Sequence, residues 1–141
     1  MIVLDTNVIA AVMRRQPDPA VVDWLDRQPA EALWTTAVTV CEVRFGLELL
    51  DPGTRRRDLE AAFGRALEED FEGRILPFDR AAAWEAAALA AERRRRGRTV
   101  EIRDTQIAGI VIARRGVLAT GNTRHFQDLP VKVVDPWGDG R

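Results

Sequence analysis

Asp5 is the first of three acidic residues that stand where a carboxylate can do chemistry. It follows a short apolar run at residues 2–4 that predicts a buried strand, and it precedes a helical pattern over residues 6–13. In open α/β sheets, ligands bind just beyond the carboxyl ends of the strands, where Asp5 should lie. A carboxylate there can cap the following helix or hold a metal ion, and Asp5 alone does not decide between these roles.

Glu42 is the second acid, and it belongs to a stretch with helical periodicity. At about 100° per residue, Arg44 and Glu48 fall together and mark a wet face, whereas Glu42 lies on the opposite side with Phe45 and Leu49. We therefore expect Glu42 to be buried. A buried carboxylate is costly unless it is paired or bound to a metal, so a salt bridge with an arginine and a metal site are both open.

Asp104 is the third acid. It is in line with Ile107, Ala108 and Val111 on the apolar stripe of a predicted helix, and it occupies the first turn. The helix dipole favours an anion in the first turn, which explains an acid there but not its place on the apolar face. Three such acids make a plausible site for Mg²⁺ or Mn²⁺, which prefer oxygen ligands and can activate water or polarise a phosphoryl group.

Four sequence motifs, one around each acid and one nearer the end, occur in a recognisable order. They are LDTN at 4–7, TVCEVRFG at 39–46, RDTQIA at 103–108 and ATGNTRHF at 119–126. Together they resemble the PIN-domain ribonucleases, specifically the VapC toxins of bacterial toxin–antitoxin pairs. The closing VDPW at 134–137 resembles the FitB-like branch of that family. The similarity covers essentially the whole chain.

This resemblance implies an endoribonuclease that depends on Mg²⁺ or Mn²⁺. It implies Asp5 and Asp104 as the principal metal ligands, with Glu42 completing the acidic pocket as a catalytic and metal-binding residue. The resemblance implies a fourth acid in the segment after the next strand, where this chain instead carries Asn122 and His125, with Asp128 beyond. The neutral oxygen of Asn122 can still ligate a metal or orient water. The positions expected to orient water or substrate are Thr6, Asn7, Thr120 and Arg124.

The resemblance also implies an RNA substrate, a small cognate antitoxin, a homodimer and a location in the bacterial cytoplasm. We expect a groove for an apolar antitoxin helix on the first two helices, around Val8, Ile9, Val12, Met13, Val21, Val22, Trp24 and Leu25. No apolar run is long enough to cross a membrane. Because of the departure at Asn122, a binding protein that keeps the fold but has weak or no activity remains an alternative.

The residue inventory excludes several other chemistries. Lys132 is the only lysine and there is no Walker A or dinucleotide fingerprint, so a P-loop mechanism is excluded. His125 is the only histidine, which excludes a paired-histidine ribonuclease, and we interpret it as a loop residue. The single cysteine, Cys41, forbids an internal disulfide and is expected to be a buried thiol. The arginines at 93–96 are interpreted as a solvated helix face, in a chain of net charge −1.

Alternating strand and helix patterns must bring these residues together. Strands are predicted at 2–4, 33–36, 75–78, 117–120 and 131–134, and helices at 6–13, 20–27, 37–50, 56–69, 80–96 and 102–115. Asp79 is expected to cap the fifth helix. This alternation indicates a three-layer α/β/α sandwich with a mostly parallel central sheet, formed by residues 1–141 as a single PIN-like domain.

Overall fold

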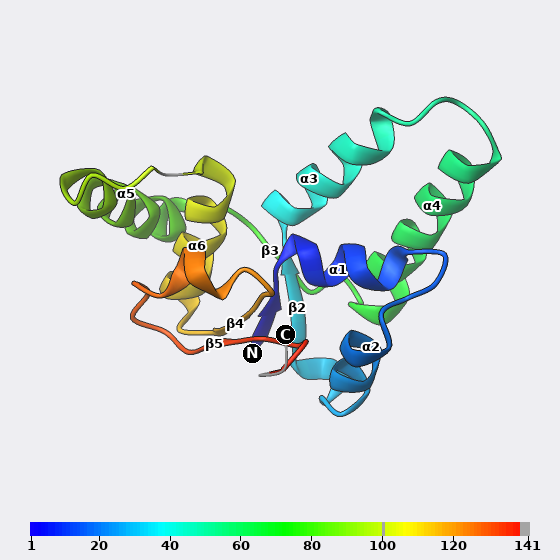
Figure 1. Cartoon of the computed structure of the whole chain (residues 1–141), viewed down its shortest axis with the longest axis horizontal. Helices are drawn as coiled ribbons and strands as arrows, with labels where there is room; N and C mark the ends of the chain where they lie inside the picture. Colours follow the sequence, from blue (N-terminus) through cyan, green and yellow to red (C-terminus); the bar gives the residue numbers. More distant parts are fainter. Residues whose placement is uncertain (100, 139–141) are drawn as a thin grey trace.

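Five short strands form the centre of the computed structural model, which describes residues 1–99 and 101–138. The strands are β1 (Ile2–Leu4), β2 (Leu33–Thr36), β3 (Ile75–Leu76), β4 (Val117–Ala119) and β5 (Val133–Val134). They lie in the order β3-β2-β1-β4-β5, and each neighbouring pair is parallel. β1 is therefore central, and its carboxyl end opens onto the middle of one sheet edge (Figure 1).

Within the described residues, six α-helices connect and cover the strands. They are α1 (Thr6–Met13), α2 (Pro19–Asp26), α3 (Ala37–Glu48), α4 (Thr54–Arg65), α5 (Arg80–Arg95) and α6 (Ile102–Arg114). Two 3₁₀ turns, η1 (Ala30–Ala32) and η3 (Thr123–Phe126), and one π-helical turn, η2 (Ala66–Asp70), complete the elements. The predicted helix boundaries hold to within two residues, except where the helix predicted at 56–69 becomes α4 followed by η2.

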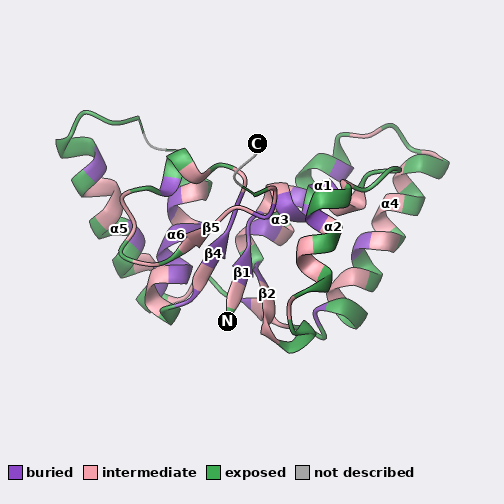
Figure 2. Ribbon diagram, turned by 60° about the horizontal axis from the view of Figure 1, so that its bottom comes forward, coloured by how far each residue is buried: buried purple, intermediate pink, exposed green. Residues whose placement is uncertain are grey.

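Neighbouring residues of one strand face opposite sides of the sheet, and each side has its own core. Leu4 of β1 and Ala119 of β4 pack with α1, α2, α3 and α4, whereas Val3 and Leu118 pack with α5 and α6. Figure 2 shows this buried material running along the strands between two groups of helices. The structure therefore confirms the predicted three-layer sandwich, with every strand pair parallel in the described part of the chain.

Residues at or shortly after the carboxyl ends of three strands cap the helices that follow. The side chains of Asp5, Thr36 and Asp79 each accept a backbone N–H from the first turn of α1, α3 and α5. This confirms the prediction for Asp79, and it places all three side chains at the carboxyl edge of the sheet. The strands predicted at 75–78 and 131–134 are shorter than expected, and the first ends where Pro77, which has no N–H, follows Leu76.

The predicted orientation of α3 was wrong in part. Its buried face carries Thr39, Val43 and Leu47, while Phe45 is 56% exposed and Leu49 is 70% exposed. Cys41 is exposed as well, so it is not the buried thiol that the sequence suggested. The error arose because Arg44 and Glu48 were interpreted as the solvent-facing side of the helix. In the structure they belong to an ion-pair network that includes α4, as described below.

Arg44 and Glu48 of α3 join a network of four charged side chains. Arg44 contacts Glu48 at 2.6 Å and Glu60 of α4 at 3.0 Å, and Arg56 of α4 contacts both of these carboxylates. Charge on this side of α3 thus takes part in a helix–helix contact, although 56% of the Glu48 side chain stays exposed. Within residues 1–99 and 101–138, none of the helices has the length and apolarity needed to span a bilayer.

Candidate active site

Asp5 is buried at the end of β1, with 2% of its surface exposed. Its Oδ1 accepts a hydrogen bond from the backbone N–H of Thr6 at 2.8 Å. Its Oδ2 accepts one from the Thr120 hydroxyl at 2.7 Å and one from the Asn7 side-chain amide at 3.2 Å. Asp5 is therefore both a helix cap and a carboxylate held in one orientation by three donors from β1–α1 and β4.

Burial raises the pKa of Asp5 from 3.8 to about 6. The hydrogen bonds from Thr120 and Thr6 act against this rise, while the negative charges of Asp104 and Glu42 add to it. The three acids that the sequence singled out therefore interact across one space. A cation in that space would favour the ionised form of Asp5, because it would replace repulsion by attraction.

Glu42 lies at the boundary of the core, with 20% of its side chain exposed. Its Oε1 accepts a hydrogen bond from the Thr6 hydroxyl at 3.0 Å, and its Oε2 lies 3.9 Å from the Arg103 guanidinium. The hydroxyls of Thr36, Thr39 and Thr6 form a chain that ends on this carboxylate. Burial raises the pKa of Glu42, and the hydrogen bond from Thr6 and the charge of Arg103 oppose this rise without cancelling it. The long contact with Arg103 therefore does not fully compensate the buried charge.

Asp104 occupies the first turn of α6, above the buried Ile107 and Ala108, as predicted. Its backbone N–H donates to Oε2 of Glu101 at 2.8 Å, which makes Glu101 the N-cap of α6. Its Oδ2 lies 3.2 Å from Nδ1 of His125. His125 thus contacts one of the three acids, whereas the sequence analysis interpreted it only as a loop residue.

Glu101 is a further acid near the site that sequence reasoning missed. Burial works against its ionised form, but the N–H of Asp104 and the guanidinium of Arg103 outweigh that effect and lower its pKa. Glu101 directly precedes the helix predicted at 102–115, and this N-cap position could have indicated its role. Because Glu101 is engaged with its own helix, we do not count it among the principal acids.

Asn7 and Thr120 form hydrogen bonds that hold Asp5 and the residues after β4 in place. The Asn7 amide donates to the Thr120 hydroxyl at 3.1 Å, and its Oδ1 accepts the backbone N–H of Gly121 at 3.0 Å. The Thr120 hydroxyl also accepts the backbone N–H of Asn122 at 3.0 Å. These contacts orient Asp5 and the chain after β4. The side chain of Asn122 itself is exposed at the start of η3.

Arg93 fastens η3 to α5 and α6. Its guanidinium makes a two-pronged contact with Asp128 at 2.8 and 2.9 Å, and it donates to the carbonyl of His125 at 2.7 Å and the hydroxyl of Thr105 at 3.3 Å. Arg93 is only 4% exposed, so its assignment to a solvated face was wrong, whereas the three arginines after it are exposed. Its partner Asp128 lies 35 residues away in the sequence, and no local sequence pattern can reveal a pairing over such a separation.

The donor set of Asp5, Glu42 and Asp104 suits a hard divalent cation in chemical type, because all three are carboxylates and their charges act on one another. In the part of the chain that the structure describes, no three acidic, histidine or cysteine side chains already form a group that could hold a metal ion. Coordination partly through water, which Mg²⁺ commonly keeps, is compatible with such an open arrangement.

The chain resembles proteins of one family over nearly its whole length. The family model described as PIN domain matches residues 2–132. A protein named VapC ribonuclease Y4jK, from Sinorhizobium fredii, is 36% identical over 97% of this chain and 98% of its own. Toxin FitB of Neisseria gonorrhoeae is 36% identical over 99% of this chain and 100% of its own. The crystal structure of FitAcB from Neisseria gonorrhoeae superposes with a TM-score of 0.88 at 36% identity, covering 97% of this chain and 99% of that one.

Proposed function

Because this chain belongs to the PIN-domain family, we propose that it is an endoribonuclease that hydrolyses RNA phosphodiester bonds as the toxin of a toxin–antitoxin pair. The observation that carries the proposal is the buried carboxylate of Asp5, oriented by three donors and electrostatically coupled to Glu42 and Asp104. Such a carboxylate is costly for the fold, and a metal-dependent site at the carboxyl edge of the sheet accounts for it.

Asp5 and Asp104 would hold Mg²⁺ or Mn²⁺, directly or through water, with Glu42 completing the acidic pocket. When bound, the ion would polarise a phosphoryl oxygen and lower the pKa of attacking water. Glu42 is suited to take the proton from that water, since burial raises the pKa of its carboxyl and makes the carboxylate a better base. Thr6 fixes the Glu42 carboxylate, and Asn7 and Thr120 fix that of Asp5.

Asn122 lies in the segment where the family resemblance implies a fourth acid. Its exposed amide can accept or donate a hydrogen bond, so we propose that it orients water or a phosphate oxygen rather than adding charge. Together with Thr6, Asn7, Thr120 and Arg124, it makes the polar surroundings of the three acids. A location in the bacterial cytoplasm is part of this proposal, because the RNA substrate would be encountered there.

The test compares Asp5→Asn and Asp104→Asn with the matched control Asp79→Asn. Asp79 caps α5 at the same sheet edge, and asparagine caps helices as well as aspartate does, so the control should fold and remain active. Cleavage of RNA is measured with Mg²⁺, with Mn²⁺ and with chelator. We expect chelator and both site variants to abolish cleavage. Site variants that cleave at the rate of Asp79→Asn at saturating metal would contradict the assignment.

The departure at Asn122 favours one second candidate, a fold that binds an antitoxin and nucleic acid without turnover. This candidate predicts complex formation and no metal-dependent cleavage by the wild-type protein. Asn122→Asp separates the two: the enzyme hypothesis predicts that a fourth carboxylate leaves cleavage intact or raises it. A variant that gains cleavage absent from the wild type would establish the binding protein instead.

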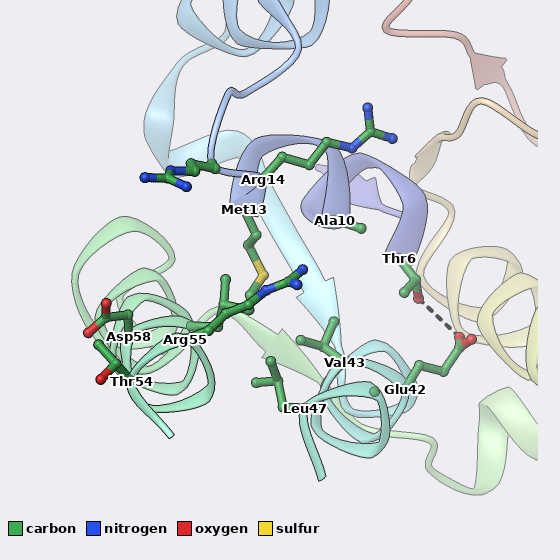
Figure 3. A pocket seen from close by; sticks show the side chains of 13 residues that line it. Thr6, Ala10, Met13, Arg14, Glu42, Val43, Leu47, Thr54, Arg55 and Asp58 are labelled. Atoms are coloured by element: carbon green, nitrogen blue, oxygen red, sulfur yellow. Dashed lines mark hydrogen bonds between the residues drawn. The ribbon is translucent and has the colours of Figure 1, made fainter. Parts of the chain in front are cut away.

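We propose that the antitoxin binds the hollow between α1, α3 and α4, of about 940 Å³. Figure 3 shows Met13 of α1, Val43 and Leu47 of α3 and Arg55 of α4 facing this hollow, with Glu42 at one end. An apolar helix with a basic end fits this lining, because it would cover the apolar side chains and reach the acids.

Three of the eight residues expected to line a groove on α1 and α2 are buried in the core, and the hollow is lined from α1, α3 and α4 instead. Val8, Ile9 and Val21 are at most 3% exposed, and Met13 is the one member of that set among the residues lining the hollow. Met13→Lys should therefore weaken antitoxin binding, whereas the exposed control Ala88→Lys on α5 should not. Equal affinities of these two variants for the antitoxin would count against the hollow as its binding place.

A further inference from the structure

A second, polar pocket of about 470 Å³ lies around η3, and its lining residue His125 contacts Asp104. Gly121, Asn122, Thr123, Arg124, His125 and Asp135 line it. Its volume falls in the range of about 300–1,000 Å³ that is typical of small-ligand sites. The roles proposed above give Asn122 and Arg124 contacts with water or substrate, but they assign no particular part of the substrate to this space.

We propose that this η3 pocket is a subsite for the RNA nucleotide next to the scissile phosphodiester, with Arg124 holding that nucleotide's phosphate. The proposal rests on the ribonuclease function and specifies where its substrate runs. Two links place the pocket at the reacting centre: His125 contacts Asp104 at 3.2 Å, and Asn122 donates its N–H to the same Thr120 hydroxyl that orients Asp5.

Three side chains that line the η3 pocket, those of Asn122, Arg124 and His125, have polar groups that can bind a ligand. Within the described chain, the side chains of Asn122 and Arg124 are exposed and take part in no hydrogen bond or ion pair. His125 uses Nδ1 toward Asp104, which leaves Nε2 for a ligand. A guanidinium offers a planar fork of donors that matches phosphate, so Arg124 supplies the charge that an RNA backbone requires.

The distribution of charge orients the ligand within the pocket. Asp135 is the one acid among the lining residues, and its Oδ1 accepts the N–H of Trp137 at 2.9 Å. A phosphate is repelled from that end and attracted to Arg124. The nucleotide therefore has its phosphate toward η3, with its sugar or base toward the polar groups near Asp135.

The pocket wall is held rigidly. Arg93 fastens the His125 carbonyl and Asp128, and Phe126 of η3 is 1% exposed in the core against β4 and α6. The Asn122 N–H is bonded to the Thr120 hydroxyl on the other side, so Arg124 is presented between two anchored points of the chain. Such pre-organisation lowers the entropy lost when a ligand binds. A merely solvated loop would have no need of a buried arginine at its base.

The test measures binding of a short, fluorescent 2′-O-methylated RNA in chelator, so that cleavage does not contribute. Arg124→Ala is compared with Arg27→Ala, which removes the same charge from an exposed position at the end of α2. We expect Arg124→Ala to weaken binding about tenfold and to reduce the slope of log affinity against log salt by about one. Equal affinity and equal slope for the two variants would overturn the subsite.

A second measurement keeps the proposal testable if the variant misfolds. Adenosine 5′-monophosphate is titrated into the wild-type protein in chelator, and backbone amide shifts are followed by NMR. Shifts at residues 121–125 support the subsite, whereas shifts confined to the α1–α3–α4 hollow overturn it. Failure of the ribonuclease proposal has a different signature: wild-type protein that binds RNA through Arg124 yet never cleaves it with Mg²⁺ or Mn²⁺ leaves the subsite standing.

Discussion

Asp5 combines burial with a negative charge, and this combination has a measurable cost. The rise of its pKa from 3.8 to about 6 corresponds to about 3 kcal/mol of lost stability once both the folded and unfolded states are ionised. The folded protein holds the proton more tightly than the unfolded chain. The cost is therefore absent below about pH 4, grows between pH 4 and 6, and is fully present above that range.

Asp5→Asn should remove this pH dependence. We expect the free energy of unfolding of the wild type, relative to the variant, to fall by about 3 kcal/mol between pH 4 and pH 7. Asparagine also turns one amide donor toward the donors of Thr120 or Thr6, a penalty of about 1–3 kcal/mol at every pH. Urea unfolding in chelator at several pH values measures the difference. A difference that stays constant with pH would show that Asp5 is not under electrostatic strain.

Divalent metal should stabilise the wild type by binding the folded state. At a free concentration one hundred times the dissociation constant, the gain is about 2.7 kcal/mol. We expect Mg²⁺ or Mn²⁺ to raise the melting temperature of the wild type and of Asp79→Asn, and to leave that of Asp104→Asn nearly unchanged. Thermal unfolding at neutral pH with metal and with chelator is the measurement, and a wild type insensitive to saturating metal would refute metal binding at the acids.

At the scale of elements, the position of Asp104 depends on how closely α6 packs against α5. Gly109 makes this possible: a Cβ added there would lie 2.5 Å from the carbonyl oxygen of Ala82 and 2.8 Å from the Cβ of Ala86. The contact with Ala82 involves backbone, which cannot give way cheaply. The alanine-rich sequence of α5 and this glycine together set the distance between the two helices that cover one face of the sheet.

Gly109→Ala should therefore destabilise the protein by about 1–3 kcal/mol through overpacking. Gly64→Ala is the matched control, since Gly64 lies in α4 and a Cβ added there would meet nothing within 4 Å. In an exposed helix, replacing glycine by alanine should stabilise by about 0.5–1 kcal/mol. Denaturant unfolding of both variants tests the pair, and a Gly109→Ala variant as stable as Gly64→Ala would contradict the close packing.

At the scale of the whole molecule, α3 presents an apolar stripe to solvent. Cys41, Phe45 and Leu49 are exposed and succeed one another at intervals of four residues, so they share one face of the helix or its end. Exposed apolar side chains of this size commonly mark an association surface. We place the expected homodimer here, because a second copy would cover the stripe.

The prediction is that the purified protein is a dimer by light scattering and that Phe45→Ser with Leu49→Ser shifts it toward monomer. The double change at another exposed apolar pair, Trp84→Ser with Ile102→Ser, serves as the control and should leave the dimer intact. Cys41 reports independently, since its reaction with a maleimide should quicken when the dimer dissociates. A wild type that is monomeric throughout, or a control pair that dissociates it instead, would locate association elsewhere.

The sequence by itself determined the order of the elements, the sandwich and the three acids, for local reasons. Strands and helices follow from hydrophobic periodicity, and the acids stand out because each begins a helix or interrupts an apolar face. The caps at Asp5 and Asp79 could be predicted because a capping side chain bonds its own first turn. All of this information lies within a few residues of the position concerned.

Tertiary structure alone decided which faces are covered and which distant residues meet. The helical wheel of α3 suggested that Phe45 was buried, on the side opposite Arg44. The wheel cannot show that Arg44 forms an ion pair with Glu60 of α4, so it assigned the solvent-facing side incorrectly. In the same way, the pairing of Arg93 with Asp128, and of His125 with Asp104, joins positions on separate elements. Such contacts depend on how the helices pack on the sheet, which is a property of the whole chain and not of any local pattern.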